Sequence, residues 1–272
     1  MTPLDLDAYF GRIGYADGRR PTLAALQAIQ LHHTQAIPFE NVDPLLRRPV
    51  LLDLPSLERK LLRDRRGGYC FEQNLLFSHV LKALGFHVTG HAARVLWNAP
   101  EGVLKARTHM LLRIELEGGS YLADVGFGVL TPTAPLRLEP DSVQSTPHES
   151  FRLARAAGGF VMQARVDGLW KSLYVFDLQE QLQPDYEVVN WYLSNHPDSR
   201  FVNELMVARP APGRRITLRN LEFRVHYIDG GSERRSIRGG AELRATLENV
   251  FDLTLPEAPE LDAALARLAA SE

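Results

Sequence analysis

The chain has 272 residues, of which 45% are hydrophobic, and its formal net charge at neutral pH is −2. This balance gives no electrostatic footprint for nucleic acid or an anionic membrane, and no apolar run reaches the roughly 18 residues of a membrane-spanning helix. The single cysteine excludes an internal disulfide and fits a reducing compartment. We therefore expect a soluble, cytoplasmic protein that is long enough for more than one domain.

The first 85 residues are predicted to form mainly helices. Residues 5–12 make a short amphipathic segment, and Thr22 is a suitable N-cap for a helix whose apolar residues recur at helical spacing. Pro38 marks the end of that helix or the turn after it. Residues 53–65 form a further helix with a proline near its start, where proline is tolerated.

From about residue 86 the apolar residues recur with the period of two that is typical of strands. The strand-like segments are residues 88–97, 108–116, 121–127, 151–154, 159–166 and 170–176. Because short glycine, proline and polar breaks separate most of them, we expect an antiparallel barrel or a strongly curved sheet. Residues 131–147 are expected to form a long irregular connection, of a kind that is often functional.

The last part of the chain is predicted to contain a linker, a hairpin and two helices. Residues 184–201 are expected to be a linker that passes over the site, and residues 216–225 pair with a strand near Tyr227. Helices follow at residues 241–250 and 257–269. The sequence contains no internal repeat, metal-ligand cluster or phosphate-binding glycine loop.

The segment Arg65-Arg66-Gly67-Gly68-Tyr69-Cys70 leads into the most distinctive of the predicted helices. Apolar residues at helical spacing follow Cys70, and Gly85 stands where a helix C-terminus favours glycine. Cys70 is therefore predicted in the first turn of a helix of about fifteen residues. The helix dipole and the nearby arginines would favour the thiolate, which is the nucleophilic form of cysteine. The alternative is a buried structural cysteine, since free cysteine is among the most buried residue types.

A nucleophilic cysteine needs a base, and His109 is the best candidate among nine histidines. It opens residues 108–114, which are apolar apart from Arg113 and indicate a buried strand. His79 lies nine residues after Cys70 on the same predicted helix, close to the opposite side, which excludes it as the partner.

Asp124 is the candidate that would orient the base. It lies inside a strand-like segment, where an unpaired carboxylate is costly. In a hairpin with a two-residue turn at Gly118-Gly119, His109 and Asp124 share a face but sit four residues out of register, whereas a longer loop would set them opposite each other. Periodicity leaves this choice open. The alternatives are structural roles, with a hydrogen-bonded core histidine and a carboxylate near a turn. The order Cys…His…Asp favours a catalytic role.

The chain resembles the arylamine N-acetyltransferases. The motifs that carry the resemblance are Asp5-Leu6-Asp7-Ala8-Tyr9-Phe10-Gly11-Arg12-Ile13, Ile37-Pro38-Phe39-Glu40-Asn41-Val42, Arg66-Gly67-Gly68-Tyr69-Cys70-Phe71-Glu72-Gln73-Asn74, Thr108-His109-Met110 and Asp124-Val125-Gly126-Phe127-Gly128. The match is strong over residues 1–130, looser over residues 186–201 and weak beyond them.

Together with this resemblance, the segments above imply an α+β fold of several domains with a cysteine-protease-like core of Cys70, His109 and Asp124. Residues 1–85 would form a helical domain that carries the nucleophile. Residues 86–190 would form a β-barrel domain that carries the histidine and the aspartate, and residues 191–272 would form an α/β lid.

The resemblance also implies roles for residues around this core. Glu40 would pair with an arginine just before the glycines and anchor the cysteine loop; Arg65 is the expected partner, and Arg66 stays open. Two solvated surface charges are the alternative. The residues expected to line an aromatic acceptor pocket are Phe39, Tyr69, Val95 and Phe127, while Trp97 and Gly128 are expected near the coenzyme A side. For the four pocket residues, ordinary core packing is the alternative.

The implied activity is ping-pong transfer of an acetyl group from acetyl-CoA, without a metal, to an arylamine, arylhydroxylamine or hydrazine. Cys70 would carry the acetyl group, His109 would relay the proton, and the backbone N–H of Cys70 would bind the oxyanion. Two other enzyme classes could use the same three residues: a thiol hydrolase or transglutaminase-like enzyme, and an amide synthase of polyketide assembly. A non-catalytic binding module is a further alternative.

Overall fold

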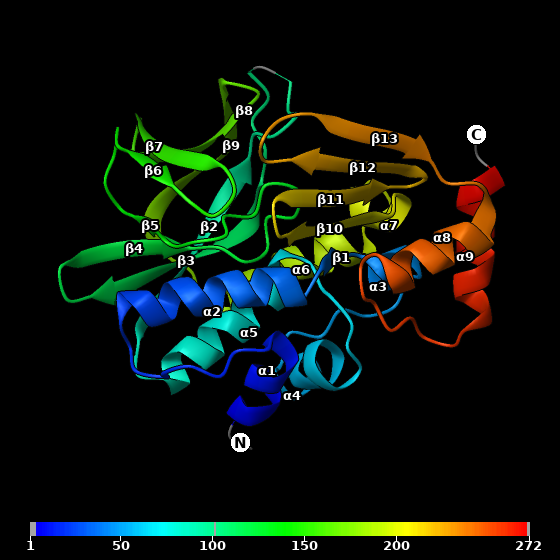
Figure 1. Cartoon of the computed structure of the whole chain (residues 1–272), viewed down its shortest axis with the longest axis horizontal. Coiled ribbons are helices and arrows are strands. Elements are labelled where there is room, and N and C mark those ends of the chain that lie inside the picture. Colours follow the sequence, from blue (N-terminus) through cyan, green and yellow to red (C-terminus); the bar gives the residue numbers. More distant parts are fainter. Residues whose placement is uncertain (1–3, 101, 271–272) are drawn as a thin grey trace.

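The fold contains two antiparallel sheets and a group of N-terminal helices. The computed structural model describes residues 4–100 and 102–270. An eight-stranded sheet and a five-stranded sheet lie side by side, and the N-terminal helices lie against them on one side (Figure 1). The α+β class expected from the sequence is therefore confirmed.

Three of the N-terminal helices, α1 (Leu6–Ile13), α2 (Leu23–Ala36) and α4 (Leu54–Leu57), begin after a residue whose side chain caps the first turn. The other elements are α3 (Val42–Leu45), the π-helical segment η1 (Glu58–Arg63) and α5 (Cys70–Ala83). The Thr22 side chain accepts a hydrogen bond from Ala25 N, as its predicted role as N-cap requires. Asp53 caps α4 in the same way, but the helix predicted over residues 53–65 changes to π-helical winding after Leu57.

Helix α5 is the central element of the helical part. It starts at Cys70, as predicted, and almost every side chain along its first three turns is buried, among them Phe71, Leu76 and Phe77. Gly85 follows the helix with a φ of +90°, a conformation that glycine adopts without steric cost. Because α5 is surrounded, its N-terminus is fixed by packing from several sides.

The eight-stranded sheet forms a nearly closed antiparallel barrel. Its strands are β2 (His87–Val95), β3 (Arg107–Leu116), β4 (Gly119–Ala123), β5 (Leu136–Arg137), β6 (Val143–Ser145), β7 (Ser150–Ala156), β8 (Gly159–Val166) and β9 (Leu169–Glu180), in the order β5-β4-β3-β2-β9-β8-β7-β6. Arg137 and Gln144 join the two edge strands, β5 and β6, through hydrogen bonds of 2.7 and 2.9 Å. The connection expected to be irregular at residues 131–147 thus contains both edge strands.

The five-stranded sheet joins segments from the two ends of the chain. Its order is β1 (Phe39–Glu40), β10 (Met206–Ala211), β11 (Arg214–Arg219), β12 (Glu222–Tyr227) and β13 (Ser232–Ser236), and α8 (Gly239–Asn249) and α9 (Pro259–Ala270) follow it in the chain. The sequence predicted the two helices and a hairpin, but residues 216–225, expected as one strand, contain most of β11, the turn and most of β12. Strand β13 was missed because its five residues are all exposed and carry no alternation of apolar and polar side chains.

The linker expected at residues 184–201 is mostly helical, which corrects that prediction. Helix α6 (Gln183–Asn195) buries Tyr186, Asn190 and Leu193 at helical spacing, and the short helix α7 (Arg200–Asn203) follows it. The Asp185 side chain accepts a hydrogen bond from Leu182 N and closes the first turn of α6. A domain boundary at residue 190 would divide this helix.

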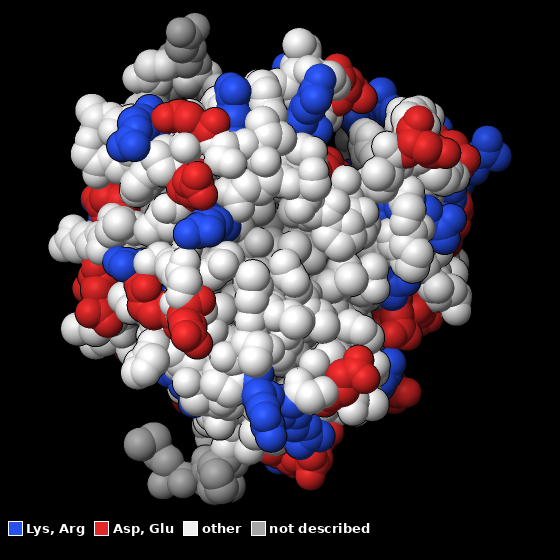
Figure 2. Space-filling model, turned by 60° about the vertical axis from the view of Figure 1, so that its left-hand side comes forward, with Lys and Arg blue, Asp and Glu red and all other residues white. Residues whose placement is uncertain are grey.

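The surface carries charges of both signs. On the face in Figure 2, acidic and basic side chains lie mainly around a broad central area that shows neither. Within residues 4–100 and 102–270, no helix combines the length and the apolar character needed to cross a membrane.

Candidate active site

Cys70 is the first residue of α5 and lies against strand β3. Its side chain is buried, with 3% of the residue's surface exposed, and Sγ lies 3.6 Å from the carbonyl oxygen of Thr108. The helix start is closed by Glu72, whose carboxylate accepts a hydrogen bond of 3.0 Å from Tyr69 N. In the described part of the chain, no acceptor lies within hydrogen-bond distance of the Cys70 N–H, which leaves this donor free at the positive end of the helix.

His109 and Asp124 form a buried pair. His109 Nε2 donates to Asp124 Oδ2 over 2.7 Å, and both residues are buried. Burial by itself would lower the pKa of His109, but the Asp124 carboxylate and contact with Cys70 together raise it to about 10. In turn, the pKa of Asp124 would be raised by burial, and the histidine lowers it below its usual value. Because Asp124 occupies Nε2, the other ring nitrogen, Nδ1, is left for the thiol.

The register of the β3–β4 hairpin lies between the two that the sequence left open. Leu116 pairs with Gly119 and Leu112 with Ala123, so the turn is Glu117-Gly118. Asp124 follows the last residue of β4, and one further step in this register places it across from Leu111. It is therefore two residues from His109, on the same face of the hairpin, which is a diagonal position within reach of a side-chain hydrogen bond.

Asp124 is held by four hydrogen bonds. Besides His109, the hydroxyl of Tyr174 donates to Oδ2 over 3.1 Å, while Asn74 Nδ2 and Gly126 N donate to Oδ1 over 3.1 and 2.9 Å. Sequence reasoning missed Asn74 and Tyr174. Asn74 had a signal, because it lies four residues after Cys70 and so on the same face of α5; Tyr174 is a distant strand residue that no motif marks.

A site loop, residues 124–133, forms one wall around these side chains. A Cβ atom built on Gly126 would lie 2.7 Å from the Cys70 Cα atom, so only glycine fits at this approach. The Phe127 ring meets His109 edge-on with centroids 5.1 Å apart. Gly128 has a φ of +87°, and a Cβ atom built there would contact the Phe39 ring at 3.4 Å. Phe127, Phe39 and Gly128 therefore lie together at the site.

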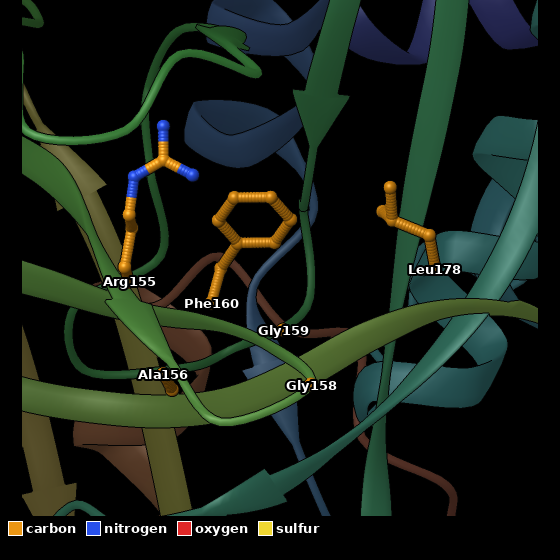
Figure 3. Close-up of a pocket in the computed structure, with 6 residues that line it drawn as sticks. All are labelled: Arg155, Ala156, Gly158, Gly159, Phe160 and Leu178. Atoms are coloured by element: carbon orange, nitrogen blue, oxygen red, sulfur yellow. The ribbon is translucent and has the colours of Figure 1, made fainter.

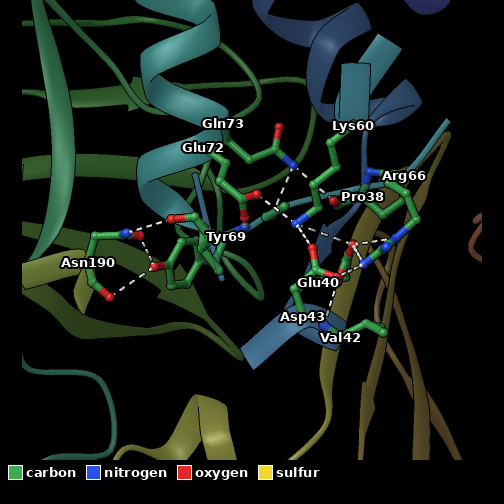
Figure 4. A network of polar contacts seen from close by, with 12 residues as sticks. Pro38, Glu40, Val42, Asp43, Lys60, Arg66, Tyr69, Glu72, Gln73 and Asn190 are labelled. Carbon is green, nitrogen blue, oxygen red and sulfur yellow. Dashed lines mark hydrogen bonds and ion pairs between the residues drawn. The ribbon is translucent and has the colours of Figure 1, made fainter. Parts of the chain in front are cut away.

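The other expected pocket residues lie in different surroundings. Tyr69 is fully buried and its hydroxyl donates to the side-chain oxygen of Asn190, which is an environment of core packing (Figure 4). Val95 ends β2 and pairs with Tyr174, the residue that also contacts His109. Trp97 is partly buried against the barrel core, with its backbone N–H donating to Leu173 O.

The partner of Glu40 is Arg66 and not Arg65, which corrects the expected pair. Arg66 donates to Glu40 Oε1 from Nε and Nη2 over 3.0 and 2.7 Å, whereas Arg65 is half-exposed and pairs with Asp252 at 3.1 Å. Arg65 has a φ of +49°, and the two consecutive side chains take opposite directions. Both arginines therefore form ion pairs with carboxylates, and neither is available to stabilise the Cys70 thiolate.

A buried network surrounds the Glu40–Arg66 pair (Figure 4). Lys60 Nζ lies 2.7 Å from Asp43 and 2.6 Å from Glu72. Burial raises the pKa of Glu72 to about 7 against the opposing effect of Lys60. Because Glu72 also caps Tyr69 N, this network links the loop before Cys70 to the N-terminal helices.

Neither a metal cluster nor the cavity in Figure 3 coincides with these residues. Among the residues that the structure describes, no three His, Cys, Asp or Glu side chains are grouped so as to hold a metal ion. A cavity of about 390 Å³ lies at the β7–β8 turn (Figure 3). Its lining residues are Arg155, Ala156, Gly158, Gly159, Phe160 and Leu178.

The chemistry available at the site is that of an activated nucleophile. A buried thiol lies 3.6 Å from the carbonyl oxygen of Thr108, the next residue carries an imidazole that a carboxylate orients, and a free backbone N–H lies at the thiol's own residue. This arrangement suits attack on an acyl carbon and stabilisation of the resulting oxyanion.

Comparison with known proteins gives full-length matches. A family model described as N-acetyltransferase matches residues 22–260. The chain is 44% identical to the arylamine N-acetyltransferase of Mycobacterium tuberculosis (strain H37Rv), over 97% of this chain and 95% of the relative. It is 43% identical to that of Escherichia coli K12, over 95% and 92%. The solved structure of the Mycobacterium marinum arylamine N-acetyltransferase in complex with CoA superposes with a TM-score of 0.94 at 40% identity, covering 97% of this chain and 99% of that one.

Proposed function

The chain belongs to the arylamine N-acetyltransferase family, and we propose that it transfers the acetyl group of acetyl-CoA to arylamines, arylhydroxylamines or hydrazines through an acetylated Cys70. The observation that carries the proposal is the buried His109–Asp124 pair, beside which Cys70 Sγ lies 3.6 Å from the carbonyl oxygen of Thr108, the residue before His109. A relative from Salmonella typhimurium, 40% identical over 91% of this chain, is named as both an arylamine N-acetyltransferase and an N-hydroxyarylamine O-acetyltransferase, which supports both acceptor classes.

In the first half-reaction the proton of the Cys70 thiol passes to His109. The sulfur then forms a bond to the acetyl carbon, and the carbon–sulfur bond to coenzyme A breaks as the thiolate of coenzyme A leaves. Because the pKa of His109 is raised to about 10, the imidazolium holds the proton until the leaving thiolate accepts it.

In the second half-reaction the acceptor nitrogen attacks acetyl-Cys70. His109 removes a proton from that nitrogen, the carbon–sulfur bond to Cys70 breaks, and the amide leaves. Asp124 keeps the imidazole oriented and stabilises its charged form, and it is in turn held by Asn74, Tyr174 and Gly126.

The oxyanion of both half-reactions would be bound by the Cys70 N–H, which has no acceptor in the described part of the chain. The acceptor ring would lie beside Phe127 and Phe39, with Tyr69 and Val95 behind them. Trp97 and Gly128 would face the coenzyme A side. These roles rest on placement and on the family's motifs.

Full-length similarity to arylamine N-acetyltransferases favours acetyl transfer over the hydrolase, transglutaminase-like and amide synthase alternatives. Intact-protein mass spectrometry after incubation with acetyl-CoA, without an amine, tests the proposal directly. Wild-type protein should gain one acetyl group and lose it when an arylamine is added, and Cys70→Ala should do neither. If acetyl-CoA leaves the wild-type mass unchanged and coenzyme A is not released when amine is present, acetyl transfer is wrong.

A further inference from the structure

The far end of the site loop is attached to the C-terminal sheet by a buried ion pair. Arg215, on β11, donates from Nε to both oxygens of Glu149 over 2.6 and 2.9 Å, and from Nη2 to the carbonyl oxygen of Thr131 over 2.9 Å. Only 2% of the Arg215 surface is exposed. The guanidinium therefore joins three segments: the site loop, the start of β7 and the C-terminal sheet.

Through its own hydrogen bonds, Thr131 connects Arg215 to the residues that surround His109. Its hydroxyl accepts a hydrogen bond of 2.7 Å from Gly128 N and donates one of 3.1 Å to Gly128 O. Gly128 lies against Phe39, and its neighbour Phe127 lies against His109. Arg215 is thus connected to the wall of the site through two successive contacts, one with Thr131 and one from Thr131 to Gly128.

A second contact holds the same end of the loop. His148 lies between Thr133 and the C-terminal sheet: Nδ1 is 3.1 Å from the Thr133 hydroxyl, and Nε2 donates to Ala211 O over 3.0 Å. Burial, followed by the charge of Arg215, lowers the pKa of His148, so the neutral imidazole is favoured between these partners.

The catalytic side chains also have contacts outside this attachment. Asp124 is fixed by Asn74, Tyr174 and Gly126, and Cys70 is fixed by the start of α5. Buried ion pairs are weak evidence for stability, because desolvation offsets their attraction. A loss of the Arg215 contacts should therefore move Phe127 more than the thiol or the imidazole.

From this separation we infer that Arg215 and Thr131 are positioning residues that fix the acceptor wall of the site. The C-terminal sheet thereby takes part in recognition of the arylamine. The inference rests on the proposed function. It assigns to the Arg215–Glu149 pair a role in the second half-reaction and leaves the first half-reaction to Cys70, His109 and Asp124.

The test separates the two half-reactions in three variants. Thr131→Val keeps every charge and removes the hydroxyl. Arg215→Lys keeps the positive charge but cannot donate the several hydrogen bonds that the planar guanidinium makes. The double variant Arg215→Met with Glu149→Gln removes both buried charges. Arg219→Met is the matched control, since Arg219 lies on the same strand in an exposed pair with Glu204. Acetylation of Cys70 is followed by mass at saturating acetyl-CoA, and deacetylation is followed against arylamine concentration.

In the three variants the acetylation rate should stay within about twofold of wild type, while the arylamine concentration for half-maximal deacetylation rises roughly tenfold, as expected for a displaced binding wall. The control should leave both unchanged. The inference is overturned if the variants that fold show wild-type dependence on arylamine, or if both half-reactions slow by the same factor. If the charge variants fail to fold, the comparison of Thr131→Val with wild type is sufficient for the test. Absence of acetylation in wild type would overturn the proposed function itself, which is a distinct result.

Discussion

Protonation of His33 should destabilise the protein between neutral and mildly acidic pH. His33 is fully buried in α2; Nδ1 lies 2.8 Å from the Tyr9 hydroxyl and Nε2 lies 2.7 Å from Gln73 Oε1. The amide nitrogen of Gln73 donates to carbonyl groups, so its oxygen faces the imidazole as an acceptor. Nε2 therefore carries the proton and Nδ1 accepts from Tyr9, which is the neutral form.

The magnitude follows from the pKa. Burial lowers the pKa of His33 from 6.5 to about 4. Below pH 6.5 the unfolded chain binds a proton that the folded protein does not bind until about pH 4, so stability falls as pH falls through this window. Between about pH 7 and about pH 5 the loss from this residue alone is about 2 kcal/mol.

Urea unfolding of wild type and His33→Gln at these two pH values measures this loss. The variant should be less stable at neutral pH, because it alters the hydrogen bonds to Tyr9 and Gln73, but it should lose about 2 kcal/mol less than wild type on acidification. His32→Gln controls for removal of a neighbouring histidine on the same helix. Equal losses in wild type and His33→Gln would refute a buried neutral imidazole at this position.

Four substitutions make further predictions. Asp124→Asn should slow acetylation of Cys70 by roughly 10³- to 10⁴-fold, because an amide orients and stabilises the imidazolium poorly, and stopped-time mass spectra would measure the rate. Asn74→Ala should slow it by roughly tenfold, because three other donors still hold Asp124; a loss as large as that of Asp124→Asn would contradict this. Arg66→Met should lower the free energy of unfolding by about 3–5 kcal/mol, since it removes both guanidinium hydrogen bonds to the buried Glu40 and leaves Lys60, 4.0 Å away, as its cationic partner. Arg65→Met should lower it by less than about 1 kcal/mol, and similar losses in urea for the two arginines would refute this assignment.

Local signals were enough to predict the start of α5 and the barrel-like sheet. The glycine pair and the apolar spacing after Cys70 are properties of neighbouring residues, as is the period of two from residue 86. The structure confirms both. His109 and Asp124 are also brought together as the sequence order suggested, although their catalytic role stays a prediction.

Long-range choices could not be read from the sequence. Arg65 and Arg66 are the same residue type side by side, and only the turn at Arg65 decides which one enters the interior. The pairing of β1 with β10 involves two residues whose partners lie far along the chain. Helix α6 was missed because its buried face includes a polar residue, Asn190, while the apolar residues Trp191 and Tyr192 are exposed and obscure the helical period.

The insertion of β1 into the C-terminal sheet has a consequence for synthesis of the chain. The Asn41 side chain donates to Glu204 O, 163 residues away, and accepts from Met206 N. A nascent chain that ends before Phe201 lacks the acceptors and the donor of that amide and the strand that pairs with β1, so the segment joined to Arg66 and the cysteine loop completes its contacts late. Such high contact order slows folding and exposes an unpaired edge to other chains. Truncations upstream of β10 are therefore expected to expose the unpaired edge of β1 to association with other chains.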